Sequence, residues 1–340
     1  MSPPRSSSVP GVRRDFTWKD GERVVRFGRA ALEDAPALLG DGYVLLTTER
    51  ALAQAPQLAE RAAAVHTVPA GAVDQLAGDL LAPLAGHDGL IVALGGGRVV
   101  DVAKAVAAAR PGRRAAAVPT TLSAAEMTWL HRHARGVSED TPRARAAVVL
   151  NDPDLSASQP APDLFASAAN SLGHAVEAPA TTLSSPVPAL AAREAVALTA
   201  RAIVDPARPD REALALAALL SGYAIDAAWY GLHHVCSQTL RTAGAAHGPA
   251  NAAMLPHTAR ALRERAPEAL AALDEAAAMP VEDLAGRLAV LAEAERLRDI
   301  GVAEDALPGL ARAAAARREL ELTPPAPGEP QLLALYREAW

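Results

Sequence analysis

The sequence contains little of several residue types that mark particular classes of protein. Its single cysteine, Cys236, cannot form an internal disulfide, as is typical of a chain in a reducing compartment. Aromatic residues make up only 3% of the 340 residues, so the core must be built mainly from alanine, leucine and valine. No apolar run approaches the roughly 18 residues needed to span a bilayer. We therefore expect a cytoplasmic protein that does not enter a membrane.

Concentrated positive charge is also missing. The formal net charge is −6, and lysine and arginine are spread among acidic residues, so no segment would attract a phosphate backbone. This argues against nucleic acid as a partner. The opening MSPPRSSSVPGVRR is basic and rich in serine and proline, but no apolar segment follows it. We predict a disordered tail over residues 1–20 and no signal peptide.

The rest of the chain divides into two predicted domains, as its length favours. In residues 21–155, short β-rich runs such as RVVRF, YVLLTT and GLIVALGGG alternate with amphipathic stretches. This alternation predicts an α/β nucleotide-binding domain with a parallel sheet. In residues 156–340 the strand signals end, and alanine- and leucine-rich helical patterns run almost to the C-terminus. We predict an all-α domain there.

A glycine turn is the clearest candidate ligand-binding feature of the first domain. Gly95, Gly96 and Gly97 end a predicted strand and open a helix, so backbone amides and the positive end of the helix dipole could meet an anion such as pyrophosphate. The spacing differs from GxGxxG, and a glycine triplet can also be only a tight turn. Asp101 and Lys104, on the following helix, could reach a ligand or simply pair with each other.

A second turn, PTTLSAAEMTW, also follows a predicted strand. The hydroxyls of Thr120, Thr121 and Ser123 could contact a phosphate or a nicotinamide, although helix capping explains these residue types equally well.

The helical half carries an unusual group of histidines. Asn170 and His174 are four residues apart, which places them on one helix face, and Glu177 follows three residues later. Four of the nine histidines lie in a single short stretch, at positions His233, His234, His247 and His257. Imidazoles bind divalent metals and act as general acids near neutral pH. Among alanines and valines, each buried imidazole would need a polar partner. We predict a catalytic site formed by Asn170, His174, His233, His234 and His247.

Six motifs together resemble one known family. GGGRVVDVAKA, PTTLSAAEMT, NDPDL, NSLGHAVEA, GLHH and HGPANAAMLPH occur in the order and at the approximate separations found in iron-type alcohol dehydrogenases, which share the dehydroquinate synthase-like fold. The resemblance runs from about Arg23 to Trp340. It implies NAD(P)H bound in a cleft between the two domains, with the histidines facing its nicotinamide, and it implies a homodimer.

The resemblance leaves the metal open. Metal-binding members hold iron or zinc with an aspartate, a histidine four residues later, and two further histidines fourteen residues apart. Asn170 stands in place of that aspartate, while His174 and His247 match histidines. The remaining ligand would be His233 by counting or His234 by its context. A neutral amide adds no charge to hold a hard divalent ion.

The asparagine and the doubled histidine resemble the maleylacetate reductase branch, which implies reduction of a carbonyl with the histidines as proton donors. SAAE instead of AGSE, and Ser237 with Gln238 instead of a further histidine, depart from that branch. The chain is also similar to dehydrogenases of daptide-type natural-product pathways, which implies oxidation and decarboxylation of a C-terminal threonine in a peptide. The substrate is therefore a small molecule or a peptide.

Two other readings belong to different classes. A dehydroquinate synthase-like lyase would need basic residues to bind a phosphorylated sugar, and residues 156–340 contain no lysine. A catalytically silent homologue would act as a partner-binding subunit. For the cofactor, Thr48 occupies the end of the second strand, where relatives that prefer NAD carry an acid that binds the ribose. Its absence favours tolerance of NADPH.

Overall fold

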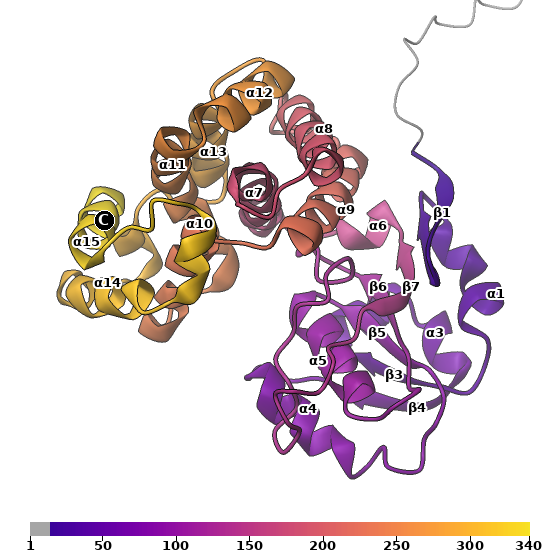
Figure 1. Cartoon of the computed structure of the whole chain (residues 1–340). Helices are drawn as coiled ribbons and strands as arrows, with labels where there is room; N and C mark the ends of the chain where they lie inside the picture. Colours follow the sequence, from indigo (N-terminus) through magenta and orange to yellow (C-terminus); the bar gives the residue numbers. More distant parts are fainter. Residues whose placement is uncertain (1–13) are drawn as a thin grey trace, which may run out of the picture.

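The computed structural model describes residues 14–340 and contains two parts, a sheet with flanking helices and a bundle of helices (Figure 1). The predicted fold class, an α/β part followed by an all-α part, is confirmed. The predicted tail is too long, because Phe16–Asp20 forms the first strand. Residues 1–13 of the predicted tail lie outside the described residues.

One seven-stranded sheet forms the first part, in the order β1-β2-β7-β6-β5-β3-β4. Its strands are β1 (Phe16–Asp20), β2 (Arg23–Phe27), β3 (Tyr43–Thr47), β4 (Ala62–Thr67), β5 (Ile91–Gly95), β6 (Ala115–Pro119) and β7 (Ala146–Asn151). All neighbours are parallel except β1 and β2, which form an antiparallel pair. The prediction missed β1 because FTWKD is a short edge strand, and only alternate residues of it are partly buried.

Helices cover both faces of this sheet. They are η1 (Ala31–Asp34), α1 (Ala35–Leu39), α2 (Glu49–Gln54), α3 (Gln57–Glu60), α4 (Val73–Leu81), α5 (Gly97–Ala108) and α6 (Pro153–Ser156). Alternation along the strands divides the core. Leu45 and Leu94 pack with α1, α2 and α3, while Leu46 and Ala93 face the opposite side and pack with α5. This second core continues into the helical part.

The helical part surrounds α7 (Ala161–Glu177), whose central position is visible in Figure 1. The remaining helices are η2 (Ala178–Ala180), α8 (Pro186–Ala202), α9 (Arg211–Ala228), α10 (Leu232–Leu240), η3 (Arg241–Ala243), α11 (His247–Arg265), α12 (Pro267–Ala277), α13 (Val281–Leu291), η4 (Leu297–Ile300), η5 (Glu304–Ala306), α14 (Leu307–Ala315), η6 (Arg318–Leu322) and α15 (Glu329–Ala339). The small residues of α7 let its neighbours approach closely. A Cβ added at Gly173 would lie 2.5 Å from the His233 ring.

Within residues 14–340, no single helix has the length and apolar character required to cross a membrane. One pair, Arg211–Ala228 with Leu232–Ala243, meets those criteria only when joined across a bend of 107°.

Candidate active site

The glycine turn lies at the carboxyl edge of the sheet, where the strand order reverses. From β3 the chain first builds β4 at the sheet edge, then crosses back to β5 on the other side of β3 and continues outward to β6 and β7. Open α/β sheets bind ligands at such a reversal. Thr47 pairs with Leu94 in register, so Thr48 follows β3 beside the point where Gly95 ends β5. The Thr48 hydroxyl accepts a hydrogen bond from the Ala51 amide and caps α2.

The glycine turn and the second predicted turn are in direct contact. A Cβ on Gly96 would lie 3.0 Å from Thr121, and one on Gly97 would lie 3.0 Å from Ser123. Thr120 is buried beside them, and its amide donates to the Gly95 carbonyl at 3.0 Å. Gly96 precedes α5 without a side chain that caps the helix. The first amides of α5 therefore have no intrahelical acceptor and could bind an anionic group.

Lys104 has a different position from the one predicted. Its side chain is fully buried, and its ammonium donates to the carbonyls of Ala125, Thr128 and Leu130 at 2.8, 3.0 and 2.7 Å. Asp101 lies 2.9 Å from the same ammonium. Three carbonyls and a carboxylate occupy all three N–H donors. Of the two alternatives that the sequence left open for these residues, the structure has the pair of Asp101 with Lys104 and not a free ligand contact, and Lys104 holds the 125–130 segment in place.

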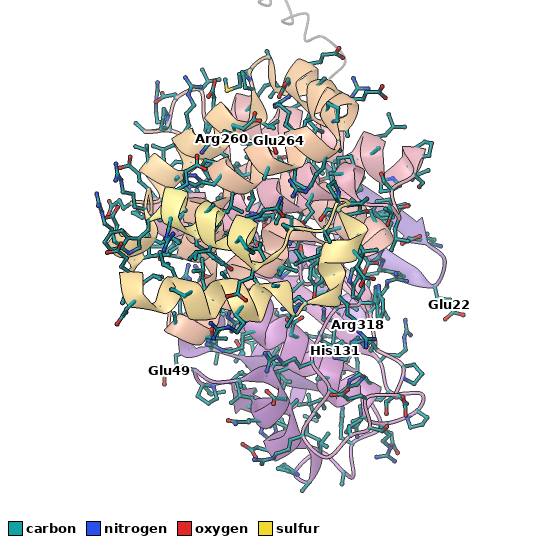
Figure 2. The ribbon with its side chains drawn as sticks, turned by 60° about the vertical axis from the view of Figure 1, so that its left-hand side comes forward. Glu22, Glu49, His131, Arg260, Glu264 and Arg318 are labelled. Atoms are coloured by element: carbon teal, nitrogen blue, oxygen red, sulfur yellow. The ribbon has the colours of Figure 1, made fainter. Side chains whose placement is uncertain are left out.

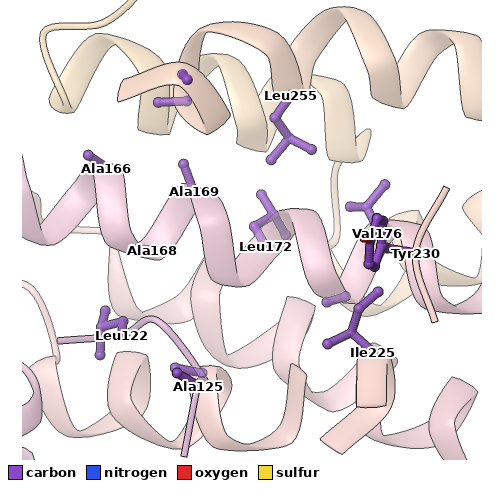
Figure 3. Close-up of a cluster of buried hydrophobic side chains, with 14 of the residues drawn as sticks. Leu122, Ala125, Ala166, Ala168, Ala169, Leu172, Val176, Ile225, Tyr230 and Leu255 are labelled. Carbon is purple, nitrogen blue, oxygen red and sulfur yellow. The ribbon is translucent and has the colours of Figure 1, made fainter. Parts of the chain in front are cut away.

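Helix α7 contacts the 120–123 turn beside the glycines and also carries His174 of the imidazole group. The Leu122 amide donates to the Ser167 hydroxyl on α7 at 3.0 Å, and Figure 3 shows Leu122 and Ala125 beside this helix. Ser167, Asn170 and His174 follow one face of α7 at a spacing of three and four residues. His174 is thus roughly 10 Å along the helix axis from the contact with the 120–123 turn.

His174 and His234 form the centre of the candidate site. Their rings stack with centroids 4.7 Å apart and planes 10° from parallel. Burial lowers the pKa of both groups, and nearby imidazoles lower the pKa of His174 further, so both rings are neutral at neutral pH. Three buried atoms here have no hydrogen-bond partner among the described residues: Asn170 Oδ1, His174 Nδ1 and His234 Nε2. Buried polar atoms are rarely left unpaired, which marks this position as a candidate binding site.

The structure separates the two neighbouring histidines of GLHH. His233 is fully buried, and its ring nitrogens contact Thr258 Oγ1 at 2.8 Å and Asn251 Oδ1 at 3.0 Å. Both nitrogens are therefore occupied by side chains of α11. His233 belongs to the packing of the bundle, and its predicted place in the catalytic group is corrected. His234 is the member of the pair that faces His174.

The other two clustered histidines differ in position. His247 begins α11 with a solvent-exposed side chain, and its carbonyl accepts from Asn251 Nδ2 at 2.7 Å. Asn251 also contacts His233 Nε2 at 3.0 Å, and a proton on His247 would lower the pKa of His174 and of His234, so His247 lies near the group. His257 is remote from this group and contacts Arg260 at 2.9 Å and Glu338 at 3.5 Å. Figure 2 shows Arg260 on the outer face of the bundle.

Several residues that the sequence prediction did not include border the site. Glu177 Oε2 lies 2.7 Å from His234 Nδ1, and the Tyr230 ring lies 5.8 Å from the His234 ring. Trp229 stacks on Tyr230 and contacts Trp129 of the sheet half, with ring centroids 5.5 and 4.9 Å apart. Trp229 has φ 59° and ψ −174°, a conformation that glycine adopts readily and other residues rarely adopt. The available signal for Glu177 in the sequence was an acidic residue three positions after His174 among apolar neighbours.

The geometry does not fit a shared metal ion. Lone pairs on imidazole nitrogens lie in the ring planes, and the nearly parallel planes of His174 and His234 do not meet at a point between them. Asn170 adds no negative charge. Among residues 14–340, no three His, Cys, Asp or Glu side chains are grouped to hold a metal. We therefore derive no chemical step through a metal.

Comparison with known proteins identifies the family. Residues 165–340 match the model of the Fe-containing alcohol dehydrogenase family, C-terminal. The chain belongs to this family of Fe-containing alcohol dehydrogenases, which confirms the predicted resemblance.

Particular relatives place the chain near maleylacetate reductases. It is 35% identical to maleylacetate reductase 1 of Rhodococcus opacus over 176 residues, which are 49% of each chain. It is 31% identical to 1,3-propanediol dehydrogenase of Citrobacter freundii over 213 residues, 57% of this chain and 55% of that protein. The matched part therefore spans about half the length of these curated relatives. The crystal structure of maleylacetate reductase from Agrobacterium tumefaciens superposes with a TM-score of 0.80 and 25% identity, covering 97% of this chain and 99% of that one.

Proposed function

We propose that this protein is an NAD(P)-dependent oxidoreductase, similar to maleylacetate reductases, that transfers hydride between a nicotinamide and a carbonyl or alcohol group. One observation carries the proposal. The glycine turn at the strand reversal contacts the 120–123 turn, which contacts the face of α7 that bears Asn170 and His174. A single extended ligand can therefore touch an anion-binding helix terminus and a group of neutral imidazoles.

The residues around the glycine turn fit a dinucleotide. The amides at the start of α5 and the hydroxyls of Thr121 and Ser123 would hold its pyrophosphate, because they line a turn that only glycine allows to pack this closely. The nicotinamide, when bound, supplies or accepts the hydride. Thr48 presents no carboxylate at the end of β3, so a ribose phosphate would meet no repulsion there, and we expect NADPH to be accepted.

The imidazoles of the helical half would act on the reacting oxygen. His234 Nε2, His174 Nδ1 and Asn170 Oδ1 are buried polar atoms available to a substrate, and their burial excludes water from the reacting group. Proton transfer and hydrogen bonding by such groups contribute roughly 10²- to 10⁴-fold to a rate.

Nucleotide binding is the direct test. Full-length protein is titrated with NADPH and with NADH while the fluorescence of the nucleotide is followed. Gly97→Ala should weaken binding by about tenfold or more, because the new methyl group would meet Ser123 at 3.0 Å in the turn that holds the pyrophosphate. Gly286→Ala is the matched control, since a Cβ there has no atom within 4 Å. If neither nucleotide binds the wild-type protein, the proposal is wrong.

A further inference from the structure

Arg317, which immediately precedes η6, contacts two residues that flank His234 along the chain. Its Nη2 donates to the Tyr230 hydroxyl at 3.1 Å and to Gln238 Oε1 at 3.3 Å. Tyr230 stands four residues before His234, and the two rings lie 5.8 Å apart. Gln238 follows His234 by four residues and therefore lies on the same face of α10. The guanidinium of Arg317 thus lies beside the row of side chains whose central member is His234.

Glu319 and Tyr230 hold this guanidinium in one orientation. Arg317 Nε donates to Glu319 Oε2 at 3.0 Å, and Arg317 Nη2 donates to Glu319 Oε1 at 2.6 Å. The Tyr230 hydroxyl donates to the same Oε1 at 3.0 Å, and Trp229 stacks on the Tyr230 ring. Paired hydrogen bonds between an arginine and a carboxylate fix the geometry as well as adding energy. Arg317 is therefore held in place before any ligand is present.

One edge of the guanidinium remains available to a ligand. An arginine has five N–H groups, one on Nε and two on each terminal nitrogen. The partners described above use Nε and Nη2, and within residues 14–340 the Nη1 group has no hydrogen-bond partner. The side chain is 32% exposed, so solvent and solutes can reach it. Two donors of a fixed cation therefore face outward, and such a fork suits a carboxylate.

Further positive charge lies on the same side of the site. Arg143 stands 5.4 Å from the Trp129 ring, which in turn contacts Trp229 with ring centroids 4.9 Å apart. Arg318 follows Arg317 directly. Arg143 and Arg318 are both exposed, and neither forms an ion pair with another residue that the structure describes. The chain as a whole is acidic, with a formal net charge of −6, so unpaired arginines here favour an anionic ligand.

We infer that Arg317 is a binding residue that selects substrates bearing a carboxylate, which accepts hydrogen bonds from its Nη1 group while the carbonyl or alcohol of the same molecule reacts beside His234. The inference rests on the proposed function and names its substrate class, an oxo acid or the corresponding hydroxy acid. A neutral alcohol offers the free edge of the guanidinium no charged acceptor. Hydrogen bonds between charged groups are about twice as strong as neutral ones, so an acid should bind about tenfold or more tightly than its amide.

Two matched pairs of ketones test this preference. 4-Oxopentanoate and 4-oxopentanamide have the same shape and differ in charge, and 2-oxobutanoate with 2-oxobutanamide repeats the comparison with a shorter spacing. Each compound is titrated by calorimetry into full-length protein saturated with NADP⁺, which cannot reduce a ketone. We expect the acid of at least one pair to bind about tenfold or more tightly than its amide. Equal binding within both pairs, or binding of no probe, overturns the inference.

The same titrations without nucleotide keep two failures apart. If neither NADPH nor NADP⁺ binds, the proposed function is wrong. The comparison of acid with amide in the nucleotide-free protein then decides the role of Arg317 by itself, because its guanidinium is held by Glu319 and Tyr230 and not by a nucleotide.

Variants of the two paired residues should have opposite effects. Arg317→Gln should abolish the preference for the acid, whereas Glu319→Gln leaves the arginine charge without its counter-ion and should keep or increase the preference. Arg263→Gln is the matched control, because Arg263 is also 32% exposed and pairs with Glu282 at 2.6 Å, near the end of α11 opposite to His247. It should leave the preference unchanged.

A purely structural ion pair would give a different result. Its loss would lower the free energy of unfolding alike in Arg317→Gln and Glu319→Gln, and both variants would bind the acid as the wild type does. A preference kept in folded Arg317→Gln, or lost in folded Glu319→Gln, overturns the inference. Because the wild-type titration is decisive by itself, a variant that fails to fold does not remove the test.

Discussion

His233 and His234 are neighbours in the chain, but their rings have different surroundings. His233 has both nitrogens bonded to side chains of α11, whereas His234 Nε2 is free to meet a ligand. We predict that His234→Ala lowers kcat by roughly 10²- to 10⁴-fold and leaves nucleotide binding intact. His233→Ala should instead lower the free energy of unfolding by about 3 kcal/mol, because it opens a cavity and strands Asn251 and Thr258.

Two measurements separate these outcomes. Chemical denaturation reports the free energy of unfolding, and the absorbance of the reduced nucleotide reports turnover. Maleylacetate and 1,3-propanediol are the first compounds to test, because they appear in the names of two relatives. A large loss of stability in His234→Ala with full activity retained, or the converse in His233→Ala, would contradict the assignment.

Asn170 determines what the site can hold. Its neutral amide stands four residues before His174, and the stacked imidazoles do not converge on one point. We predict that Asn170→Asp raises the affinity for zinc by about tenfold or more, since a carboxylate adds the charge that a hard ion requires. Metal analysis of both purified proteins after dialysis against zinc checks this. Stoichiometric zinc or iron in the wild type would show that the geometric argument is wrong.

The sequence predicted which residue types gather at the site better than it predicted what each of these residues contacts. The spacing of Asn170 and His174 placed both on one face of a helix, and the structure has them there. The choice between His233 and His234 depended on contacts with α11, which is distant in sequence, so spacing could not decide it. Lys104 follows a glycine turn, so its sequence position allowed either a ligand contact or a pair with Asp101, and the structure has the pair. Its three carbonyl partners lie 21 to 26 residues away and leave no sequence pattern.

At the scale of elements, Lys104 determines the position of the segment after β6. Its ammonium joins α5 to three carbonyls of the 125–130 segment. Burying this charge without such partners would cost several kcal/mol of stability. We predict that Lys104→Met lowers the free energy of unfolding by about 3–5 kcal/mol, because it leaves Asp101 and three carbonyls without their donor. Lys19→Met, at an exposed position of β1, should change it by less than about 0.5 kcal/mol. Equal effects in chemical denaturation would refute this role.

The loop between β6 and β7 should respond to acid. The Ala144 amide donates to His131 Nε2 at 3.0 Å, and Nδ1 lies 2.9 Å from the Arg132 carbonyl, so only the neutral ring fits. Burial lowers the pKa of His131 from 6.5 to about 4. Between these values the unfolded chain binds the extra proton, so this histidine's contribution to stability falls as the pH decreases from 6.5 to 4, by about 3 kcal/mol in total.

His131→Gln isolates that contribution, because its side-chain oxygen can accept from Ala144 at any pH. Other buried groups titrate in the same range, and Glu126, whose pKa burial raises to about 7, acts in the opposite direction. The comparison is therefore the difference in unfolding free energy between variant and wild type, measured at several pH values. That difference should favour the variant increasingly below pH 6.5, and a difference independent of pH would exclude the role of His131.

Elements with strong internal patterns were predictable, and weakly patterned ones were not. β3, β5 and β6 are buried along their whole length and appear in the sequence as continuous apolar runs, as parallel strands do. The edge strand β1 has polar residues and a tryptophan and lacks a continuous apolar run. Its backbone is held in the strand conformation by antiparallel pairing with β2. The amphipathic stretch that follows YVLLTT, residues 50–64, forms α2, α3 and the start of β4, because Pro56 interrupts the helical pattern.

For the molecule as a whole, the two halves are joined at a polar contact as well as through the shared core. Asp226 on α9 accepts from the Trp129 amide at 2.6 Å and from Arg145 at 2.8 Å, and both donors belong to the sheet half. The buried core continues from the sheet into the bundle. A chain with such a continuous core should unfold in one transition, although many two-domain proteins do not.

Asp226→Ala tests this coupling. Arg145 is half exposed, so its ion pair contributes little to the free energy of unfolding. The amide of Trp129, however, would lose its acceptor beside the contact between Trp129 and Trp229. We predict a loss of about 1–3 kcal/mol in the free energy of unfolding and a change in tryptophan fluorescence before the loss of helical circular dichroism. Asp205→Ala, which removes an exposed ion pair with Arg208, should leave both signals unchanged. If the two signals still coincide in Asp226→Ala, the shared apolar core couples the halves without help from Asp226. If the two signals already separate in the wild type, the halves unfold independently, and the shared core couples them less strongly than its continuity implies.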